Sequence, residues 1–343
     1  MHLRRTLNRA NVPAVQWLLK SKDPSIRYLT LTEILGQAED SKEARNARRL
    51  IPSGPRVKAL LAGQQVDGGF GVHPYQKWAG AHWRLVSLVE LGIPRGDRRA
   101  VRATDLVLKW LLGEEHLGNI PKINGRYRRC ASQEGNALGV CSRLGLSKDP
   151  RVIRLAESLV EWQWPDGGWN CDRRPAAHHS SFNETLSPMW GLLEFHLANG
   201  DNDSLSAGAR AAEFFLRHHL FRSCRTGELR PPETFHSRVF RAVHPWTTLH
   251  YPLYWHYDIL QSLVMLSRMK KLNDPRTKEA LDLVESKRGS DGLWRPEAYY
   301  WSMRRKPSRA KISNVEVVDW GRNSPNEFIT LNALRVLKIA DRL

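Results

Sequence analysis

Long apolar runs, cysteine pairs and acidic residues are scarce in this chain of 343 residues. No run of about 18 apolar residues occurs, so the sequence predicts no transmembrane segment. The N-terminus has basic residues without an apolar stretch behind them, which argues against a secretory signal. The four cysteines, Cys130, Cys141, Cys171 and Cys224, form no Cys-x-x-Cys pair. A chain this long does not need disulfides, so these observations predict a cytoplasmic protein.

Positive charge is in marked excess. Lys and Arg number 53 against 35 Asp and Glu, which gives a formal net charge of +18 and a pI near 10.1. This excess favours anionic partners, namely phosphorylated small molecules, nucleic acid or an acidic membrane surface. The 41% of apolar residues is enough for a packed globule. The 13 tryptophans indicate either stacking surfaces or large wedges in a thick core.

A short glycine turn recurs along the chain. Gln-Gln-Val-Asp-Gly-Gly-Phe at residues 64–70 returns as Gln-Trp-Pro-Asp-Gly-Gly-Trp at 163–169 and, more weakly, as Arg-Gly-Ser-Asp-Gly-Leu-Trp at 288–294. Degenerate turns at 113–118 and 226–228 fall between these copies. The period is therefore about 50 to 60 residues, enough for two helices and their loops.

Two kinds of helical pattern flank the turns. An amphipathic stretch precedes each turn, and a more apolar stretch, richer in small residues, follows it. The first kind covers residues 13–19, 56–65, 98–112, 151–163, 207–219 and 276–287. The second kind covers residues 29–35, 79–91, 133–144, 184–197, 254–269 and 327–339. Asp-Pro pairs at 23–24, 149–150 and 274–275 mark helix starts, with Asp as the cap.

The aromatic residues that end the turns, Phe70, Trp169 and Trp294, are predicted to wedge between neighbouring repeats. The aspartates within the turns are predicted to cap them rather than to act as acids. These residues are therefore assigned to the fold and not to a site.

Six helical hairpins predict an all-α fold, an (α/α)6 toroid with inner and outer helix layers. The last pattern is an inner helix without an outer successor, and the first outer pattern can fill that place, which favours closure of the ring. We expect residues 1–343 to form a single domain. An open solenoid of the HEAT type is the alternative.

The Gln-x3-Gly-x-Trp spacing at residues 163–169 resembles the QW repeat of squalene and oxidosqualene cyclases and of protein prenyltransferase β subunits. The resemblance implies an α/α toroid and, as an expectation, a cavity for an isoprenoid-like phosphorylated substrate. The Asp-x-Asp-Asp motif of class II cyclases is absent, which argues against protonation-initiated cyclisation. The prenyltransferase zinc set, an Asp-x-Cys pair with a distant His, has only a partial counterpart in Cys171-Asp172.

In a toroid, all inner helices would begin at the rim that carries the glycine turns. Six helix N-termini would then offer free N–H groups and dipole ends, each worth about 0.3–1 kcal/mol to a nearby anion. Basic residues crowd the loops at this rim, so we expect it to bind anions. These residues are Lys122, Arg126, Arg128, Arg129, Arg222, Arg225, Arg230, Arg238, Arg241, Arg304, Arg305, Lys306, Arg309 and Lys311.

The predicted catalytic groups are the carboxylates Asp258, Glu184 and Glu134. Asp258 is the strongest candidate of the three, because burial of an acid on an aromatic helix face costs free energy and is expected only where the acid has a function. Capping alone is an alternative explanation for Glu184. The residues expected to bind the substrate are Trp78, His82, Trp83, Arg129, His179, His250, Tyr251, Tyr254, Trp255 and Glu327.

The spacing of the aromatic residues before Asp258 carries part of this prediction. Tyr251, Tyr254, Trp255 and Asp258 are spaced i, i+3, i+4 and i+7, so they would share one face of an inner helix. Such a face would present aromatic walls above a carboxylate, as pockets for cations and apolar chains do.

A zinc site is the one cofactor that the sequence suggests. Cys171, Asp172 and His178 are suitable ligand types, although their spacing matches no established zinc motif. A plain surface role for His178 and its neighbour therefore stays open.

Three classes of function remain. The first is an enzyme of the prenyltransferase and squalene cyclase type, with a cavity for an apolar phosphorylated substrate. The second is a protein that binds nucleic acid through its basic rim and stacks Trp and Tyr on bases. The third is a glycosidase-like toroid that uses Asp258 and Glu184 as paired carboxylates.

Overall fold

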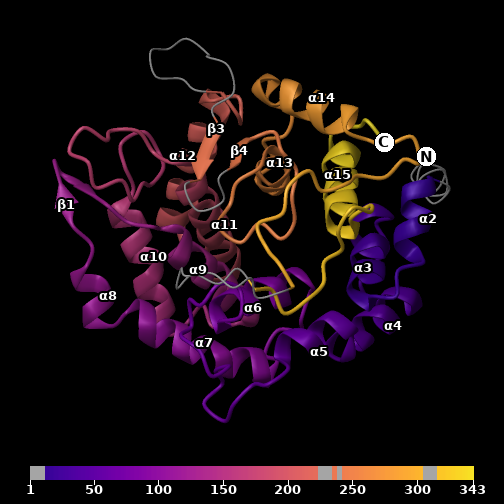
Figure 1. Ribbon diagram of the computed structural model, residues 1–343, viewed down its shortest axis with the longest axis horizontal. Coiled ribbons are helices and arrows are strands. Elements are labelled where there is room, and N and C mark those ends of the chain that lie inside the picture. Colours follow the sequence, from indigo (N-terminus) through magenta and orange to yellow (C-terminus); the bar gives the residue numbers. More distant parts are fainter. Residues whose placement is uncertain (1–11, 223–233, 238–241, 304–314) are drawn as a thin grey trace.

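The computed structural model describes residues 12–222, 234–237, 242–303 and 315–343. Within these ranges the chain is all-α, with two short antiparallel hairpins as its β structure. The helices follow one another around a centre that loops cross (Figure 1). Over the described ranges, no helix is both long and apolar enough to cross a membrane.

Helices of the amphipathic kind lie where the sequence predicts them. Each buries one face; for α10 that face is Val152, Leu155 and Leu159. Aspartate caps with a following proline begin three helical segments, as predicted: the side chains of Asp23 and Asp149 accept from backbone N–H groups at 2.9 Å, and that of Asp274 does so at 3.0 Å. The helices are α2 (Pro13–Leu19), α5 (Pro55–Leu61), α7 (Arg98–Leu111), α10 (Pro150–Trp162), α12 (Asn202–Arg217) and α14 (Lys278–Ser286).

Helices of the apolar kind are buried on nearly every side. In the order of the chain they are α3 (Pro24–Leu29) with its π-helical continuation η1 (Thr30–Ile34), α6 (Ala81–Glu90), α9 (Ser132–Leu144), α11 (Phe182–Asn199), α13 (Ile259–Arg268) and α15 (Glu327–Ile339). The backbones of α9 and α11 touch, because a Cβ on Gly135 would lie 2.3 Å from the nitrogen of Pro188.

The helix predicted at 254–269 is too long at its start. Helix α13 begins only at Ile259, because the side chain of Asp258 caps it by accepting from the N–H of Gln261 at 2.8 Å. Tyr254, with a φ of 56°, lies in the loop before the helix. The prediction that Tyr251, Tyr254, Trp255 and Asp258 share a helix face is therefore wrong.

Several shorter elements have no counterpart in the predicted pattern. They are α4 (Lys42–Leu50), η2 (Ile51–Ser53), α8 (Glu114–Gly118), η3 (Pro275–Thr277), and the strand pairs β1 (Lys122–Ile123) with β2 (Arg126–Tyr127) and β3 (Thr234–Ser237) with β4 (Ala242–Pro245).

The first two glycine turns are hydrogen-bonded to the amphipathic helix of the following repeat. The side-chain amide of Gln163 donates to the carbonyl oxygens of Gly167 and Ala207, both at 2.8 Å. Gln64 repeats this contact, with donation to Gly68 at 3.0 Å and to Arg99 at 2.9 Å. The glutamine of the repeat therefore ties its own turn to the following amphipathic helix.

The two tryptophans that end the glycine turns are buried, as a packing role requires. Trp169 and Trp294 are fully buried, and their indole N–H groups donate to Leu159 at 3.0 Å and to Val284 at 2.7 Å. Phe70, at the first turn, is only half-buried beneath the guanidinium of Arg84. The tryptophans at the ends of the glycine turns therefore have a structural role, as the sequence indicates.

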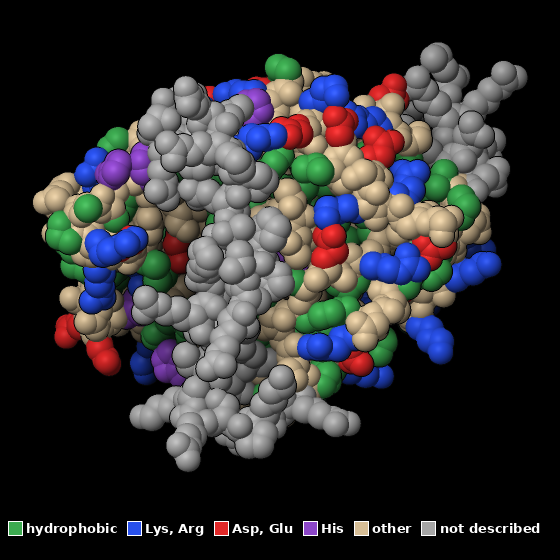
Figure 2. All heavy atoms as spheres, turned by 45° about the horizontal axis from the view of Figure 1, so that its top comes forward, with side chains coloured by type: hydrophobic (Ala, Val, Ile, Leu, Met, Phe, Trp, Pro, Cys, Tyr) green, Lys and Arg blue, Asp and Glu red, His purple; other side chains and the backbone are tan. Residues whose placement is uncertain are grey.

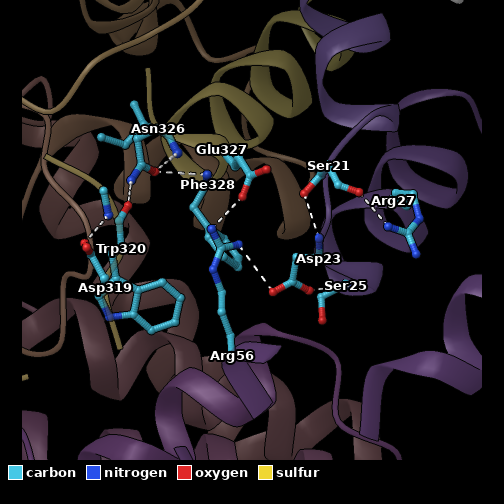
Figure 3. Close-up of polar contacts among 12 residues, drawn as sticks. Ser21, Asp23, Ser25, Arg27, Arg56, Asp319, Trp320, Asn326, Glu327 and Phe328 are labelled. Atoms are coloured by element: carbon cyan, nitrogen blue, oxygen red, sulfur yellow. Dashed lines mark hydrogen bonds and ion pairs between the residues drawn. The ribbon is translucent and has the colours of Figure 1, made fainter. Parts of the chain in front are cut away.

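The first and last helical segments pack against each other, since α15 contacts α2 and α3. Figure 3 shows Arg56 between Glu327 and Asp23 at this junction, with its guanidinium nitrogens 2.6 Å and 3.5 Å from the two carboxylates. Lys338 adds a bond of 2.7 Å to the carbonyl oxygen of Glu33. These contacts join the two ends of the described chain.

Candidate functional site

A cavity of about 370 Å³ lies among the buried helices. All six of the buried helical segments, α3 with η1, α6, α9, α11, α13 and α15, contribute side chains to its wall. The wall is mostly apolar. Its apolar members on the helices are Leu29, Val86, Val89, Leu186, Trp190, Val264, Met265, Phe328 and Ile339.

The floor of the cavity is made by the loop before α13. Tyr251, Leu253, Tyr254 and His256 line the cavity, and all four are buried. This floor lies on the side where the buried helices begin, because the loop leads directly into the N-terminus of α13.

Stacked aromatic rings support the floor from below. Tyr254 stacks on Trp78 with ring centres 4.2 Å apart, and the indole N–H of Trp78 donates to the carbonyl oxygen of Tyr300 at 3.0 Å. His256 lies between Trp255 and Tyr300, at 3.9 Å and 3.8 Å. The predicted aromatic residues thus hold the loop in place, and of this set Tyr254 reaches the cavity directly.

The mouth of the cavity lies at the opposite side. Arg143 and Arg268 are in the last turns of α9 and α13 and have side chains 42% and 31% exposed. Ile339, the last residue of α15, is 51% exposed. The predicted entrance at the rim where the inner helices begin is therefore corrected: the exposed lining residues are at the helix C-termini.

Three arginines surround this mouth. Glu194 accepts from Arg268 at 2.6 Å and lies 3.3 Å from Arg143. Arg335, whose side chain is 17% exposed, forms an ion pair with Glu33. One buried carboxylate thus serves two guanidinium groups, and the five side chains together keep a net positive charge.

Glu90 and Tyr251 form the acidic pair of the cavity. The Tyr251 hydroxyl donates to Oε2 of Glu90 at 2.9 Å, and both residues line the cavity. Burial raises the pKa of Glu90 to about 7, against the hydrogen bond from Tyr251 and the charges of Arg335 and Arg143. This carboxyl can therefore carry a proton near neutral pH.

A second cluster lies where α9 and α11 begin. The thiols of Cys130 and Cys171 and a carboxylate oxygen of Glu184 all lie within 4.8 Å of one another. Glu184 accepts from the backbone N–H of Ser132 at 3.0 Å and from the Cys171 thiol at 3.8 Å. Burial raises the pKa of Glu184, and pairing with Cys130, followed by burial, raises the pKa of the Cys171 thiol.

Glu134 occupies the equivalent position on α9 and is an ion-pair partner. It accepts from Nε of Arg129 at 2.8 Å and lies 3.2 Å from His116. Burial opposes ionisation, but the charge of Arg129 and the contact with His116 lower the pKa of Glu134 overall. Arg129, predicted to hold substrate, is therefore engaged with Glu134 and with Gln133 at 2.7 Å.

Asp258 is buried, but it does not line the cavity. Its carboxylate accepts from the backbone N–H of Gln261 at 2.8 Å and of His250 at 3.2 Å. Burial raises the pKa of Asp258 to about 7, against these two bonds. The structure therefore gives Asp258 the geometry of a helix cap.

The other predicted binding residues are dispersed. Trp83 is fully buried and lies at the edge of Trp78, at 4.9 Å. His82 is buried, and burial lowers its pKa to about 3, so its ring is neutral. Glu327 pairs with Arg56 at the junction of Figure 3. Among the ten predicted binding residues, Tyr251 and Tyr254 line the cavity.

The three predicted metal ligands do not form one cluster in the structure. Cys171 belongs to the cluster with Cys130 and Glu184. Asp172 instead accepts from the guanidinium of Arg174 at 2.9 Å, and the ring of His178 lies 2.7 Å from the carbonyl oxygen of Ala176. His179 lies on the wall of a separate surface hollow that also contains Asp172 and His178.

The predicted basic rim is only partly described. Arg225, Arg230, Arg238, Arg241, Arg304, Arg305, Lys306, Arg309 and Lys311 lie outside the described residues. Of the remainder, Arg128 is buried and donates to Ala177 at 2.9 Å, and Arg222 pairs with Glu279 at 2.9 Å. On the face shown in Figure 2, basic side chains lie beside acidic ones, so this face is mixed in charge.

Sequence reasoning missed the residues at the mouth of the cavity and one cysteine of the cluster. Arg143, Arg268 and Arg335 are basic residues on the more apolar kind of helix. A charged residue in such a helix could have indicated a site. Cys130 belongs to no sequence motif, because it comes close to Cys171 only when the chain folds.

No family model, curated protein or solved structure matches this chain.

Proposed function

We propose that the chain is an α/α toroid whose central cavity binds an apolar, isoprenoid-like molecule with a phosphate or diphosphate end. One observation carries the proposal: all six buried helical segments line a single cavity. A cavity of about 370 Å³ falls within the size range of pockets that hold small-molecule ligands.

The wall favours an apolar body for the ligand. Val86, Val264 and Met265 offer no hydrogen bonds through their side chains, and Phe328 and Trp190 add flat apolar surface. Burial of apolar ligand surface here is favourable at roughly 25 cal/mol per Å² before the costs of binding are counted.

The mouth favours an anionic end. Arg143 and Arg268 share the single carboxylate of Glu194, so each retains N–H groups for another acceptor. Guanidinium groups bind phosphate oxygens in a bidentate manner, and Arg335 stands on a third helix at the same cavity. A ligand with its chain on the aromatic floor would place its anionic end among these side chains.

If the cavity also catalyses a reaction, Glu90 is the acid or base best placed for it. Its carboxyl lines the cavity beside Tyr251, whereas the predicted catalytic carboxylates Asp258, Glu184 and Glu134 lie outside the lining. General acid catalysis requires a group within hydrogen-bond reach of the substrate. Glu90 therefore takes the catalytic role that the sequence suggested for those three carboxylates.

Calorimetric titration of the full chain tests the proposal. Farnesyl diphosphate, farnesol and inorganic diphosphate serve as ligands. We expect farnesyl diphosphate to bind best, farnesol more weakly and inorganic diphosphate weakest. Val264→Trp, which fills part of the cavity, should lower the affinity for farnesyl diphosphate at least about tenfold.

Ile153→Trp is the matched control, because Ile153 is 37% exposed on α10. It should bind as the wild type does. Equal affinity in wild type and in a folded Val264→Trp would contradict the proposal, as would inorganic diphosphate binding as tightly as the farnesyl compound.

Nucleic-acid binding is the alternative that the net charge of +18 keeps open. Its affinity would fall steeply with salt, since phosphate contacts release counterions. Binding that depends on the apolar chain would persist at high salt, which separates the two functions.

A further inference from the structure

We infer that Cys130, Cys171 and Glu184 bind one thiophilic divalent metal ion, with Zn²⁺ the best match. The two thiols and a carboxylate oxygen lie within 4.8 Å of one another, which is close enough for one ion to contact all three after small side-chain rotations. The site lies apart from the cavity lining and goes beyond the proposed function.

The backbone holds these three ligands together independently of any metal. The N–H of Arg129 donates to the carbonyl oxygen of Asn170 at 3.0 Å. These are the residues immediately before the two cysteines, so this single bond fixes the cysteine loops side by side. The N–H of Ser132 donates to Glu184 at 3.0 Å and orients the third ligand toward the same point.

The chemistry of the donors selects the metal. Thiolate ligands favour Zn²⁺, Cu⁺ and iron–sulfur clusters over Mg²⁺ and Ca²⁺, and carboxylate oxygen is a regular zinc ligand. Two thiolates and one carboxylate supply three of the four positions of tetrahedral zinc. Three protein ligands with an open fourth position is the arrangement typical of catalytic zinc sites.

Charge balance supports a cation at this place. In the described part of the chain, no Lys or Arg forms an ion pair with Glu184, while the nearby Arg129 pairs with Glu134. Among the described residues the buried Glu184 carboxylate has no salt-bridge partner, and only the more distant charges of Arg129 and Lys77 act on it. Burial of a charge without a close partner is costly. One divalent cation between the three ligands would supply that charge.

An aromatic wall connects the cluster to the cavity floor. The ammonium of Lys77, which interacts electrostatically with Cys130 and Glu184, lies 4.8 Å from the ring centre of Trp255. Trp255 stacks on His256, and His256 lines the cavity. The metal site would thus lie behind the floor of the cavity.

Metal analysis of the full chain tests the inference without any cavity ligand. Protein produced in zinc-containing medium and dialysed against metal-free buffer should retain about one zinc per chain. Titration of metal-free protein with Co²⁺ should give the thiolate-to-cobalt absorption in the near ultraviolet and the intense visible bands of tetrahedral cobalt. Cys130→Ser and Cys171→Ser should each lower the Co²⁺ affinity at least about 100-fold, and Glu184→Gln about tenfold.

Cys141→Ser is the matched control, since Cys141 is buried on α9 away from this cluster. It should bind Co²⁺ as the wild type does. Circular dichroism establishes that each variant folds, and Glu184→Gln remains informative if a cysteine variant does not fold.

Two results would overturn the inference. The first is protein without retained zinc and without thiolate-to-cobalt absorption. The second is a disulfide between Cys130 and Cys171 found in protein kept under reducing conditions. Because neither measurement uses farnesyl diphosphate, failure of the metal site and failure of the cavity proposal are distinguishable.

Discussion

Nη2 of Arg56 lies 2.6 Å from Oε2 of Glu327, which joins residues 271 positions apart in the chain. The pair links the first turn of α5 to the first turn of α15, and both side chains are 19% exposed. It therefore belongs to the contacts by which the last helix meets the first ones.

We predict that this pair contributes measurably to stability. A double-mutant cycle with Arg56→Gln and Glu327→Gln should give a coupling energy of about 1–2 kcal/mol, because the pair is mostly shielded from solvent. Urea unfolding measures it. The exposed pair Lys278–Asp282, at 2.8 Å, is the control and should give about 0.3–0.5 kcal/mol. A coupling at Arg56–Glu327 no larger than the control would refute this prediction.

The glycine turn of the repeat gives a second prediction. Gly167 has a φ of 101°, and a Cβ there would lie 2.4 Å from the carbonyl oxygen of Arg210 on α12. Gly63 also has a positive φ, 74°, but a Cβ there meets nothing within 4 Å. Gly167→Ala should therefore destabilise the protein by at least about 2 kcal/mol more than Gly63→Ala.

Thermal and urea unfolding of the two glycine variants provide the measurement. Equal losses in both variants would mean that backbone strain alone matters and that the turn does not need its close approach to α12.

The buried acid of the cavity predicts a pH dependence. Burial raises the pKa of Glu90 from 4.5 to about 7, so between these values the folded state holds a proton that the unfolded state has lost. The contribution of Glu90 to stability therefore falls as pH rises from about 4.5 to 7 and is constant above that. Glu90→Gln, which removes this titration, should gain about 2–3 kcal/mol relative to wild type across the same interval.

Urea unfolding of wild type and Glu90→Gln between pH 4.5 and 8 checks this expectation. A stability difference that does not change with pH would show that Glu90 titrates normally.

Much of the helical framework follows from the sequence. The 3.6-residue periodicity located the helices around residues 98–112, 151–163 and 327–339, because each buries one continuous face or is buried throughout. The sequence also predicted the Asp-Pro caps and the structural role of Trp169. A cap and the burial of one aromatic side chain depend mainly on residues of the same repeat.

The site could not be predicted in the same way. The apolar periodicity before Ile259 suggested a longer helix, but Asp258 caps α13 and places Tyr251 and Tyr254 in a loop. Cys130 and Cys171 become neighbours only through the packing of α9 on α11, a long-range contact without a sequence signature. The side on which the cavity opens could not be predicted either, because it depends on the conformation of loops, which have no periodic sequence pattern.

The arginines at the mouth give a further prediction. Arg268→Gln should lower the affinity for farnesyl diphosphate about tenfold, or about 1.4 kcal/mol, because one charged donor to phosphate is lost. Its affinity for uncharged farnesol should stay the same. Arg154→Gln on the outer surface of α10 is the control, since its side chain is 57% exposed, and should change neither affinity. Equal losses for both ligands in Arg268→Gln would assign the effect to altered packing.

The most direct measurement is a crystal structure of the protein with an isoprenoid diphosphate that carries a bromine atom at the far end of its chain. If the cavity binds such a ligand, anomalous density for the bromine should lie between Val86, Val264 and Phe328, with the diphosphate beside Arg143, Arg268 and Arg335. Bromine density confined to the outer surface, with these side chains contacting no ligand, would contradict the proposed function.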